Sequence, residues 1–558
     1  MRDDAGLRAD LDLRWQSLKE ERSTWLPVWR QISEYIAPHL GRFTEAVDRE
    51  DGRRNDTLII DDSARIAHRN FCSGMQSGLT FPARPWFRLT TQGDPEMGDF
   101  PPIKIWLDHV RDVLLRIFAK SNAYSSFLAT YAECGSFGVH AALVERDFDS
   151  VVRFRPFTAG EYAIGTDDRN RVDTFARSCG MSARMMVSAF GEKAVSESVR
   201  RAWDRGDVRS RFEVIHVVGP NTGRDVEKRN AANKPYYSVY YDPGDRADRV
   251  LRRSGYDSFP VIAPRWSTVS DQVYSKGSPG WFSLGNVKMI QQLQTDCLEG
   301  IQKVIDPPVQ APVALERYGL TAVPGGVNFV PDTGQGGIRS IYDVRPDIEA
   351  IEGKIQRVAV NIERAFFSDL FLMLTNMDQK GMTATEVAER HEEKLLMLGP
   401  VLEQLYAEML DPVIDRTFEL AMDAGIIPPP PPDLEGQEIK PEYVSVLAQA
   451  QRMVGISAIE QTMAFAGNLV GIFPEVRHKV DAIAAMQKYG TYVGVPAEIL
   501  RTDEEAMERM AQEAEQHRQE QAMQAVPQMA GAGKTLSETD VGGNSALDAI
   551  LGGLGGAP

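Results

Sequence analysis

A stretch rich in proline and glycine, residues 307–346, separates two long helical patterns and constrains the fold more than any other feature of the chain. Apolar residues on both sides recur at steps of three and four, which is the spacing of one face of an α-helix. The row before the stretch is Asn286, Ile290, Leu293, Cys297, Ile301 and Val304, and the row after it is Ile348, Ile351, Ile355, Val358, Ile362 and Phe366. Proline fixes φ near about −65° and glycine permits positive φ, so the stretch itself cannot be helical throughout. We therefore expect a small lobe carried on two helices, residues 281–306 and 347–368.

A chain of 558 residues is too long to fold around a single hydrophobic core, so we expect roughly three or four domain-sized units. The four cysteines have no CxxC spacing, which favours free thiols in a reducing compartment. The first residues contain no apolar segment, so we expect no secretory signal. Without a run of about 18 apolar residues, we expect no membrane-spanning helix and no membrane partner.

The net charge of −17 bears on the possible partners of the chain. A protein that holds nucleic acid by its phosphates needs clustered lysine and arginine, and this chain is acidic overall. Two interpretations stay open at this point. The charge serves solubility, or it provides a surface over which a polyanion passes without sticking.

The first half of the chain predicts an α+β lobe. Helices are expected at residues 10–36, 63–79, 102–119, 124–135 and 182–203, with Pro27 dividing the first into two and the last lying across a sheet. Short alternating runs with β-branched and aromatic residues predict strands of a mixed or antiparallel sheet at 151–157, 211–218, 236–241 and 259–266.

The second half is predominantly helical in pattern. Residues 369–382 break the periodicity, and Thr383 with Glu386 then forms a capping box at the start of a long helix, residues 383–427. Pro400 and Pro412 should each bend this helix. We expect a helical unit over residues 428–520, which opens with five prolines, and a disordered tail over 521–558.

The sequence lacks the motifs that usually mark nucleotide-binding, metal and catalytic sites. The GAGKT segment at 531–535 lacks the first glycine of a phosphate-binding loop, because Gln528 stands at that position. Neither an HExxH motif nor a Cys/His cluster occurs, and no nucleophile elbow stands out. We therefore expect no catalytic residue, no metal site and no cofactor, which weakly favours a structural role.

Two segments carry a family resemblance. The first, within residues 59–91, contains GMQSGLT followed by PARPWFRL, and the second is MTATEVAERHEEKLLMLGPVLEQLYAEMLDPVIDR at 382–416. Both resemble signature segments of the head-to-tail connector, or portal, proteins of short-tailed phages, and they occur in the expected order. The resemblance covers roughly residues 10–430.

The resemblance implies a helix-rich α+β portal fold and a ring of twelve subunits at one capsid vertex, through which double-stranded DNA is packaged and ejected. On this mapping the wing is 1–280, the stem helices are 281–306 and 347–368, the clip with short strands is 307–346, the tunnel loop is 369–382, a kinked wing helix is 383–427 and a helical crown is 428–520. The implied partners are further copies of the chain, DNA bound without sequence specificity, terminase, a tail adaptor, and the major capsid and scaffolding proteins. The implied location is the virion, with the host cytoplasm during assembly.

The same mapping gives candidate site residues. Residues implied to line the DNA channel are Lys288, Gln291, Gln294, Gln302, Lys303, Met377, Asp378, Gln379 and Lys380. Residues of the clip implied to dock terminase or the tail adaptor are Glu316, Arg317, Tyr318, Asn328 and Arg339. A glutamine-rich helix face is either simply solvated or, in a ring of subunits, a neutral lining for DNA. Few fixed basic residues are expected on such a wall, because clustered cations would hold the DNA.

Two other classes of protein stay open. A soluble α+β enzyme of unknown chemistry would be a monomer or dimer by gel filtration or electron microscopy. Another structural virion protein, such as a tail adaptor, would differ in its location in the particle.

Overall fold

The computed structural model describes most of residues 4–448 and shorter stretches beyond. The described ranges are 4–44, 56–92, 101–228, 230–245, 249–306, 347–372, 397–434, 437–445 and 456–470, with short pieces elsewhere. The chain divides into two units, Met1–Val454 and Gly455–Pro558, and each is described by itself.

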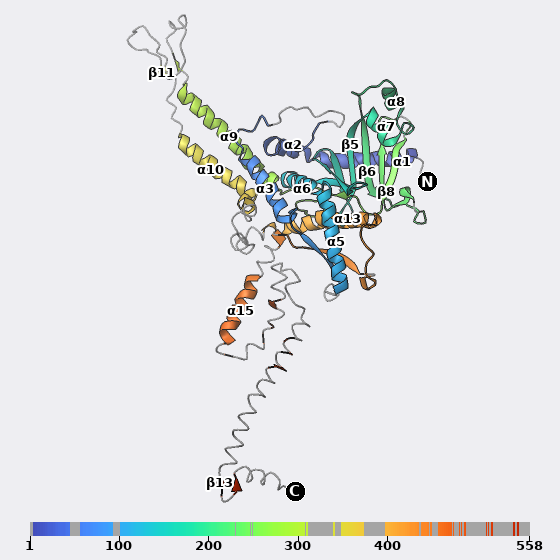
Figure 1. The fold of residues 1–558 in the computed structure, drawn as a ribbon. Coiled ribbons are helices and arrows are strands. Elements are labelled where there is room, and N and C mark those ends of the chain that lie inside the picture. The colour runs from blue at the N-terminus through green and yellow to red at the C-terminus, as the bar shows by residue number, and fades with distance from the viewer. Residues whose placement is uncertain are drawn as a thin grey trace, which may run out of the picture. The chain divides into compact units, whose positions relative to one another are not determined.

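A five-stranded antiparallel sheet forms one part of the first unit (Figure 1). Its order is β4 (Tyr162–Thr166), β5 (Val172–Ser182), β6 (Arg211–Pro220), β7 (Tyr236–Tyr241) and β8 (Val250–Tyr256). The strands predicted at 211–218 and 236–241 are confirmed as β6 and β7. Their neighbours β4, β5 and β8 were not predicted.

Helix α1 (Asp4–Ser23) covers one face of this sheet. Leu11, Trp15 and Leu18 pack there against small and branched residues of β4 to β7, because they lie on one helix face at steps of four and three. Helix α2 (Leu26–Tyr35) follows, with Pro27 in its first turn. Proline is tolerated there because the N–H groups of the first turn have no acceptor within the helix. The predicted division of residues 10–36 at Pro27 is confirmed.

Two short helices cover part of the opposite face, α7 (Ala183–Phe190) and α8 (Glu197–Asp204). The prediction of one helix over 182–203 is wrong at its centre. Gly191 adopts a φ of 85°, a left-handed value that ends α7, and Ser196 precedes the first turn of α8 in an extended conformation.

Helices and a smaller sheet complete the core of this unit. The helices are α3 (Ser63–Leu79), α5 (Pro101–Lys120) and α6 (Ala123–Phe137), and the antiparallel sheet has the order β3 (Val151–Phe157), β2 (Ala141–Asp147) and β9 (Val261–Ile262). The strand predicted at 259–266 shortens to two residues, since Pro260 and Pro264 have no N–H to pair.

The strand β12 (Glu438–Tyr443) corrects the predicted helical unit at 428–520. It pairs antiparallel with β1 (Phe87–Gln92) along all six residues, so this stretch belongs to the first unit. Tyr443 stacks on Tyr406, with ring centroids 4.1 Å apart, and on Trp86 at 6.5 Å. The strand is polar and contains Pro441, so its pairing with a distant strand, not its own pattern, selects the extended conformation.

The described part of the predicted helix 383–427 begins at residue 397 and includes a change of helical type. Residues 397–405 are α-helical, Tyr406–Leu410 form a π-helical turn, and α13 is Asp411–Asp423. The N–H of Asp411 reaches the carbonyl of Tyr406, a five-residue step, and Pro412 lies in the first turn of α13. Pro412, which was predicted to bend this helix, directly follows the wider π-helical turn.

The second unit contains α15 (Ile456–Val470), which agrees with a helical prediction for this part of the chain. Within the predicted tail, β13 (Asp540–Val541) pairs with β14 (Asn544–Ser545), so secondary structure occurs where none was expected. Among the helices that the structure describes, none combines the length and apolar character needed to cross a membrane.

Candidate functional site

The candidate site is built on α9 (Pro279–Ile305), a helix of 27 residues that spans about 40 Å at 1.5 Å per residue. Ser278 caps its start and accepts a hydrogen bond from the N–H of Trp281 at 3.3 Å, and Pro279 occupies the first turn. These residues are a favoured cap and first-turn pair, which explains why the helix begins two residues before the predicted 281.

Helix α10 (Ile348–Ala365) packs along α9 (Figure 1). Asp347 caps it by accepting a hydrogen bond from the N–H of Ala350 at 3.0 Å. Both predicted apolar rows are largely confirmed, since the buried residues of the two helices include Ile290, Cys297, Ile355, Val358 and Ile362. Only the end of the first row differs, where Val304 is 50% exposed.

The two ends of the segment that joins α9 and α10 are paired with each other. The strand β10 (Val309–Gln310) pairs antiparallel with β11 (Arg339–Ser340), Gln310 opposite Arg339. Since β10 follows α9 and β11 precedes α10, the two helices run in opposite directions. Arg339 thus lies at the base of the predicted clip, whereas Glu316, Arg317, Tyr318 and Asn328 lie outside the described residues.

One face of α9 is exposed along its whole length. The exposed residues recur at steps of three and four and are Phe282, Gly285, Met289, Gln292, Asp296, Glu299 and Lys303. The face is apolar near the start of the helix and polar further on, with two carboxylates and one lysine. Lys303 Nζ lies 3.9 Å from Glu299 Oε2, so its charge is partly balanced. The predicted channel residues Gln302 and Lys303 are both exposed, and Gln294 is half-buried.

Two other predicted channel residues are used inside the subunit. Gln291 is 4% exposed; its Oε1 accepts hydrogen bonds from the N–H groups of Ile60 and Asp61 at 2.7 and 2.9 Å, and its Nε2 donates to the Asp61 carbonyl at 2.9 Å. Lys288 Nζ donates to Gln31 Oε1 at 2.7 Å. Gln291 therefore holds the chain that enters α3 and does not fit the lining role predicted for it.

The chain after α10 is fixed to α3 by aromatic packing. Phe366 and Phe371 are fully buried against Phe71, with ring centroids 6.2 and 5.4 Å away. Between them, Phe367 has a φ of 52°, a strained value for a bulky residue. Gly74 of α3 makes this approach possible, because a Cβ there would lie 2.2 Å from Phe371 Cβ. The predicted tunnel-loop residues Met377, Asp378, Gln379 and Lys380 follow, outside the described residues.

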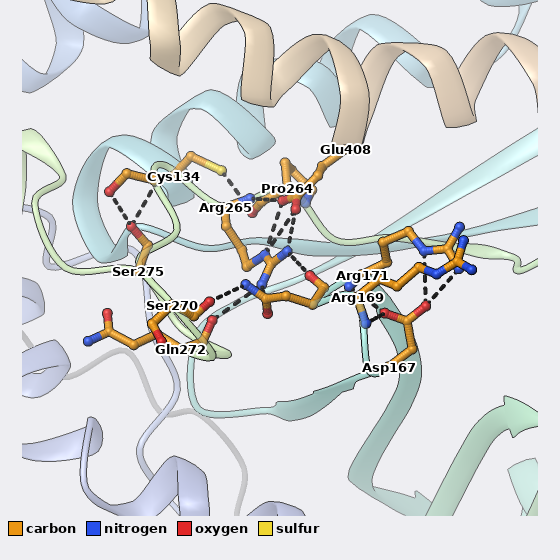
Figure 2. A network of polar contacts seen from close by, with 12 residues as sticks. Cys134, Asp167, Arg169, Arg171, Pro264, Arg265, Ser270, Gln272, Ser275 and Glu408 are labelled. Atoms are coloured by element: carbon orange, nitrogen blue, oxygen red, sulfur yellow. Dashed lines mark hydrogen bonds and ion pairs between the residues drawn. The ribbon is translucent and has the colours of Figure 1, made fainter.

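The helix that follows residues 373–396 is fixed by a second contact, the ion pair of Arg265 with Glu408 in the π-helical turn (Figure 2). The side chain of Arg265 is 2% exposed and that of Glu408 19%. Glu408 Oε2 accepts from the backbone N–H of Arg265 at 2.9 Å, and both carboxylate oxygens accept from Arg265 Nε at 3.1 and 3.2 Å. No sequence pattern links the two residues, and neither was predicted.

The remaining guanidinium hydrogens of Arg265 hold a neighbouring loop (Figure 2). Its terminal nitrogens donate to Asn170 Oδ1 at 3.0 Å and to the Asn170 carbonyl at 2.6 Å. Asn170 has a φ of 58°, and Asp167 stabilises this turn by accepting from the N–H groups of Arg169 and Arg171 at 2.9 and 2.8 Å. These bonds, with that from the Arg171 side chain, hold the pKa of Asp167 below its ordinary value. The contact thus joins three parts of the chain.

The best candidate for nucleophilic chemistry is a buried group in α3 and α6. His68 lies 3.6 Å from Cys72 Sγ and 2.9 Å from Ser136 Oγ. Burial lowers the pKa of His68 to about 4 and raises the pKa of Cys72 to about 12, so the thiolate form is disfavoured at neutral pH. Over the described ranges, no three His, Cys, Asp or Glu side chains are grouped for a metal ion.

The chain belongs to the family described as bacteriophage head to tail connecting protein, which matches residues 8–500. It is 40% identical over 539 residues to the portal protein of Salmonella phage epsilon15, covering 96% of this chain and 97% of that one. It is also 39% identical over 535 residues to the probable portal protein of Bordetella phage BPP-1, covering 96% of each. The family resemblance and the helix-rich α+β class are therefore confirmed, and the likeness extends well beyond the predicted residue 430.

Among solved structures, a chain of the virion of the native gene transfer agent (GTA) particle overlaps 81% of this chain and 96% of its own length. Its sequence identity is 12% and its TM-score is 0.32.

Proposed function

We propose that the protein is the portal of a phage, a ring at one capsid vertex through which double-stranded DNA enters and leaves the head. The observation that carries the proposal is the near full-length similarity, at 39% and 40% identity, to two portal proteins. The antiparallel helices α9 and α10, joined by a segment whose two ends pair as β10 and β11, are consistent with the proposed stem.

The proposed ring has twelve subunits, each contacting its neighbours through two different surfaces. A heterologous contact generates a ring when its rotation closes. Apolar side chains that the isolated subunit leaves in solvent are available for such contacts, among them Phe282 at 75% and Ile105 at 70% exposed. Burial of these side chains between subunits would stabilise the ring by the hydrophobic effect.

The exposed polar part of the α9 face is the proposed channel wall. Asp296, Glu299 and Gln302 would present negative or neutral groups to DNA, and Lys303 is partly neutralised by Glu299. Such a wall offers few contacts of the kind that bind phosphate, so DNA could slide past it. Lys288, which is bonded to Gln31, would contribute little to this wall.

The segment 307–346 is the proposed docking lobe, first for terminase and then for a tail adaptor. Its two chain ends are held together by β10 and β11. The segment 373–396, which includes most of the predicted tunnel loop, is held at one end by Phe371 and after its other end by Glu408.

The protein would act as a structural component and not as an enzyme, in contact with capsid and scaffolding proteins during assembly in the host cytoplasm. A gold label on the C-terminus of the protein tests this location. We expect labelled particles to carry gold at one vertex, where the tail attaches. Label distributed over all vertices, or along the tail, would contradict the proposal.

A further inference from the structure

Basic and aromatic side chains form a row on the sheet face opposite α1. In the strand register Arg177 of β5 lies opposite His216 of β6, His216 opposite Tyr240 of β7, and Tyr240 opposite Arg252 of β8. Side chains at directly opposite positions of antiparallel strands share a face and are close neighbours. His216 and Tyr240 accordingly stack with ring centroids 3.8 Å apart and an angle of 6° between their planes.

Two guanidinium groups of the row lie over aromatic rings. The Cζ atom of Arg177 is 4.6 Å from the centre of the Phe157 ring. The Cζ atom of Arg252 is 4.7 Å from the Tyr240 ring and 5.7 Å from the ring of Phe190 in α7. Cation–π contact of this kind holds a guanidinium plane in place without using its hydrogen-bond donors.

A third arginine, Arg155 in β3, adds its charge to this row. Burial and then the charges of Arg177, Arg252 and Arg155 lower the pKa of His216 well below its ordinary value. These three residues, Arg155, Arg177 and Arg252, are called the arginine cluster. Like charges at close range repel, so the cluster lowers stability unless an anion balances it.

The cluster is poorly balanced by the chain itself. Arg155 is paired with Glu145, with 3.1 Å between their nearest nitrogen and oxygen atoms. Within the part of the chain that the structure describes, Arg177 and Arg252 donate no hydrogen bond and form no ion pair, and the buried Nε of Arg177 has no acceptor. This is unexpected in a chain with 79 acidic and 62 basic residues, where carboxylates are in excess.

We propose that the arginine cluster is a docking site for an acidic segment of a partner protein, whose side-chain carboxylates bind the free guanidinium groups of Arg177 and Arg252. A guanidinium donates two parallel hydrogen bonds to a carboxylate, and these are among the stronger hydrogen bonds in proteins. Glu145 already forms an ion pair with Arg155 of the cluster. Phe190, half-buried beside Arg252, offers an apolar contact for the same segment.

A carboxylate partner fits the cluster better than DNA does. A duplex is held by basic residues arranged along its backbone, whereas this row offers two guanidinium groups without a carboxylate and the third arginine of the cluster already holds a glutamate. The net charge of −17 further disfavours a long polyanion at this face.

Fluorescence anisotropy of a labelled peptide of alternating glutamate and leucine, titrated with the purified full-length protein at about 0.1 M salt, tests the site. We expect the double variant Arg177→Gln/Arg252→Gln to weaken binding about tenfold or more, since each arginine contributes charged hydrogen bonds. The matched control is Arg171→Gln/Arg201→Gln, which removes the same charge from two exposed arginines that already have carboxylate partners. We expect this control to change affinity less than about twofold.

Arg252 is exposed, so Arg252→Gln alone keeps the test available if the double variant does not fold. A labelled 20-base-pair duplex and a peptide with glutamine in place of glutamate complete the experiment. The proposal is overturned if the glutamate peptide does not bind, if the glutamine peptide binds equally well, or if both double variants weaken binding alike. Tighter binding of the duplex, lost in Arg177→Gln/Arg252→Gln, would also overturn it in favour of a nucleic-acid site.

Discussion

The substitution Glu408→Gln tests whether one buried ion pair fixes the helical segment 397–423 to the part of the chain around Arg265. Arg265 keeps its bonds to Asn170 but loses the carboxylate that accepts from its backbone N–H and from Nε. Removal of one partner from a buried ion pair costs about 3–5 kcal/mol, and the glutamine retains one acceptor, so we expect a loss of about 3 kcal/mol. A change of this size raises the opening equilibrium of the segment by roughly a hundredfold.

Native-state hydrogen exchange measures this opening directly, because exchange of protected amides follows local opening equilibria. Amides in 397–423 should exchange roughly a hundred times faster in Glu408→Gln than in the wild type. The control is Glu403→Gln, one turn earlier on the same helix, where the side chain is exposed and the expected effect is within about 0.5 kcal/mol. Equal protection in the two variants would refute the idea that the Arg265 contact anchors this segment.

Three further predictions concern close packing, titration and docking. Gly74→Ala should lower the free energy of unfolding by about 1–3 kcal/mol, because the new Cβ would meet Phe371 at 2.2 Å. Gly285→Ala is the control and should be neutral or stabilising, because nothing lies within 4 Å of its Cβ. An unchanged free energy of unfolding in Gly74→Ala would show that the contact with Phe371 is loose. Burial raises the pKa of Glu133 from 4.5 to about 8. Between pH 4.5 and pH 8 the folded protein therefore holds a proton that the unfolded chain has lost, so the free energy of unfolding falls as pH rises. The melting temperature of Glu133→Gln relative to the wild type should therefore increase from about pH 5 to pH 8.5, and a constant difference would contradict the raised pKa. Residues 311–338 can be replaced by an Asn-Gly turn, which suits the antiparallel pairing of β10 with β11. Phage carrying this change should still form the ring but should not attach tails. Particles that acquire tails would disprove the docking role.

The helices were the part of the fold that local pattern could predict. Rows of apolar residues at helical spacing identified α9 and α10 because each of these helices buries one stripe against its neighbours. β2 escaped prediction since its first four residues are all buried, which removes the alternation expected of a half-exposed strand. β12 escaped because its conformation depends on β1, some 350 residues earlier in the chain.

The candidate site was predicted in outline, and its anchoring contacts were not. The proline- and glycine-rich segment marks the connection between α9 and α10, since neither residue type continues a helix. Arg265 and Glu408 are 143 residues apart, and each is an ordinary charged residue in its own surroundings. Gln291 has the composition expected of a solvated face, yet it satisfies two backbone N–H groups of a neighbouring segment. Long-range hydrogen bonds of this kind leave no local signal in a single sequence.

Electron microscopy of the purified full-length protein, viewed along its symmetry axis, tests the central claim most directly. If the protein is a portal, class averages should show a closed ring of twelve subunits with an open central channel. Monomers, dimers or open filaments at the same protein concentration would contradict the account, because a heterologous contact that forms a channel must close on itself.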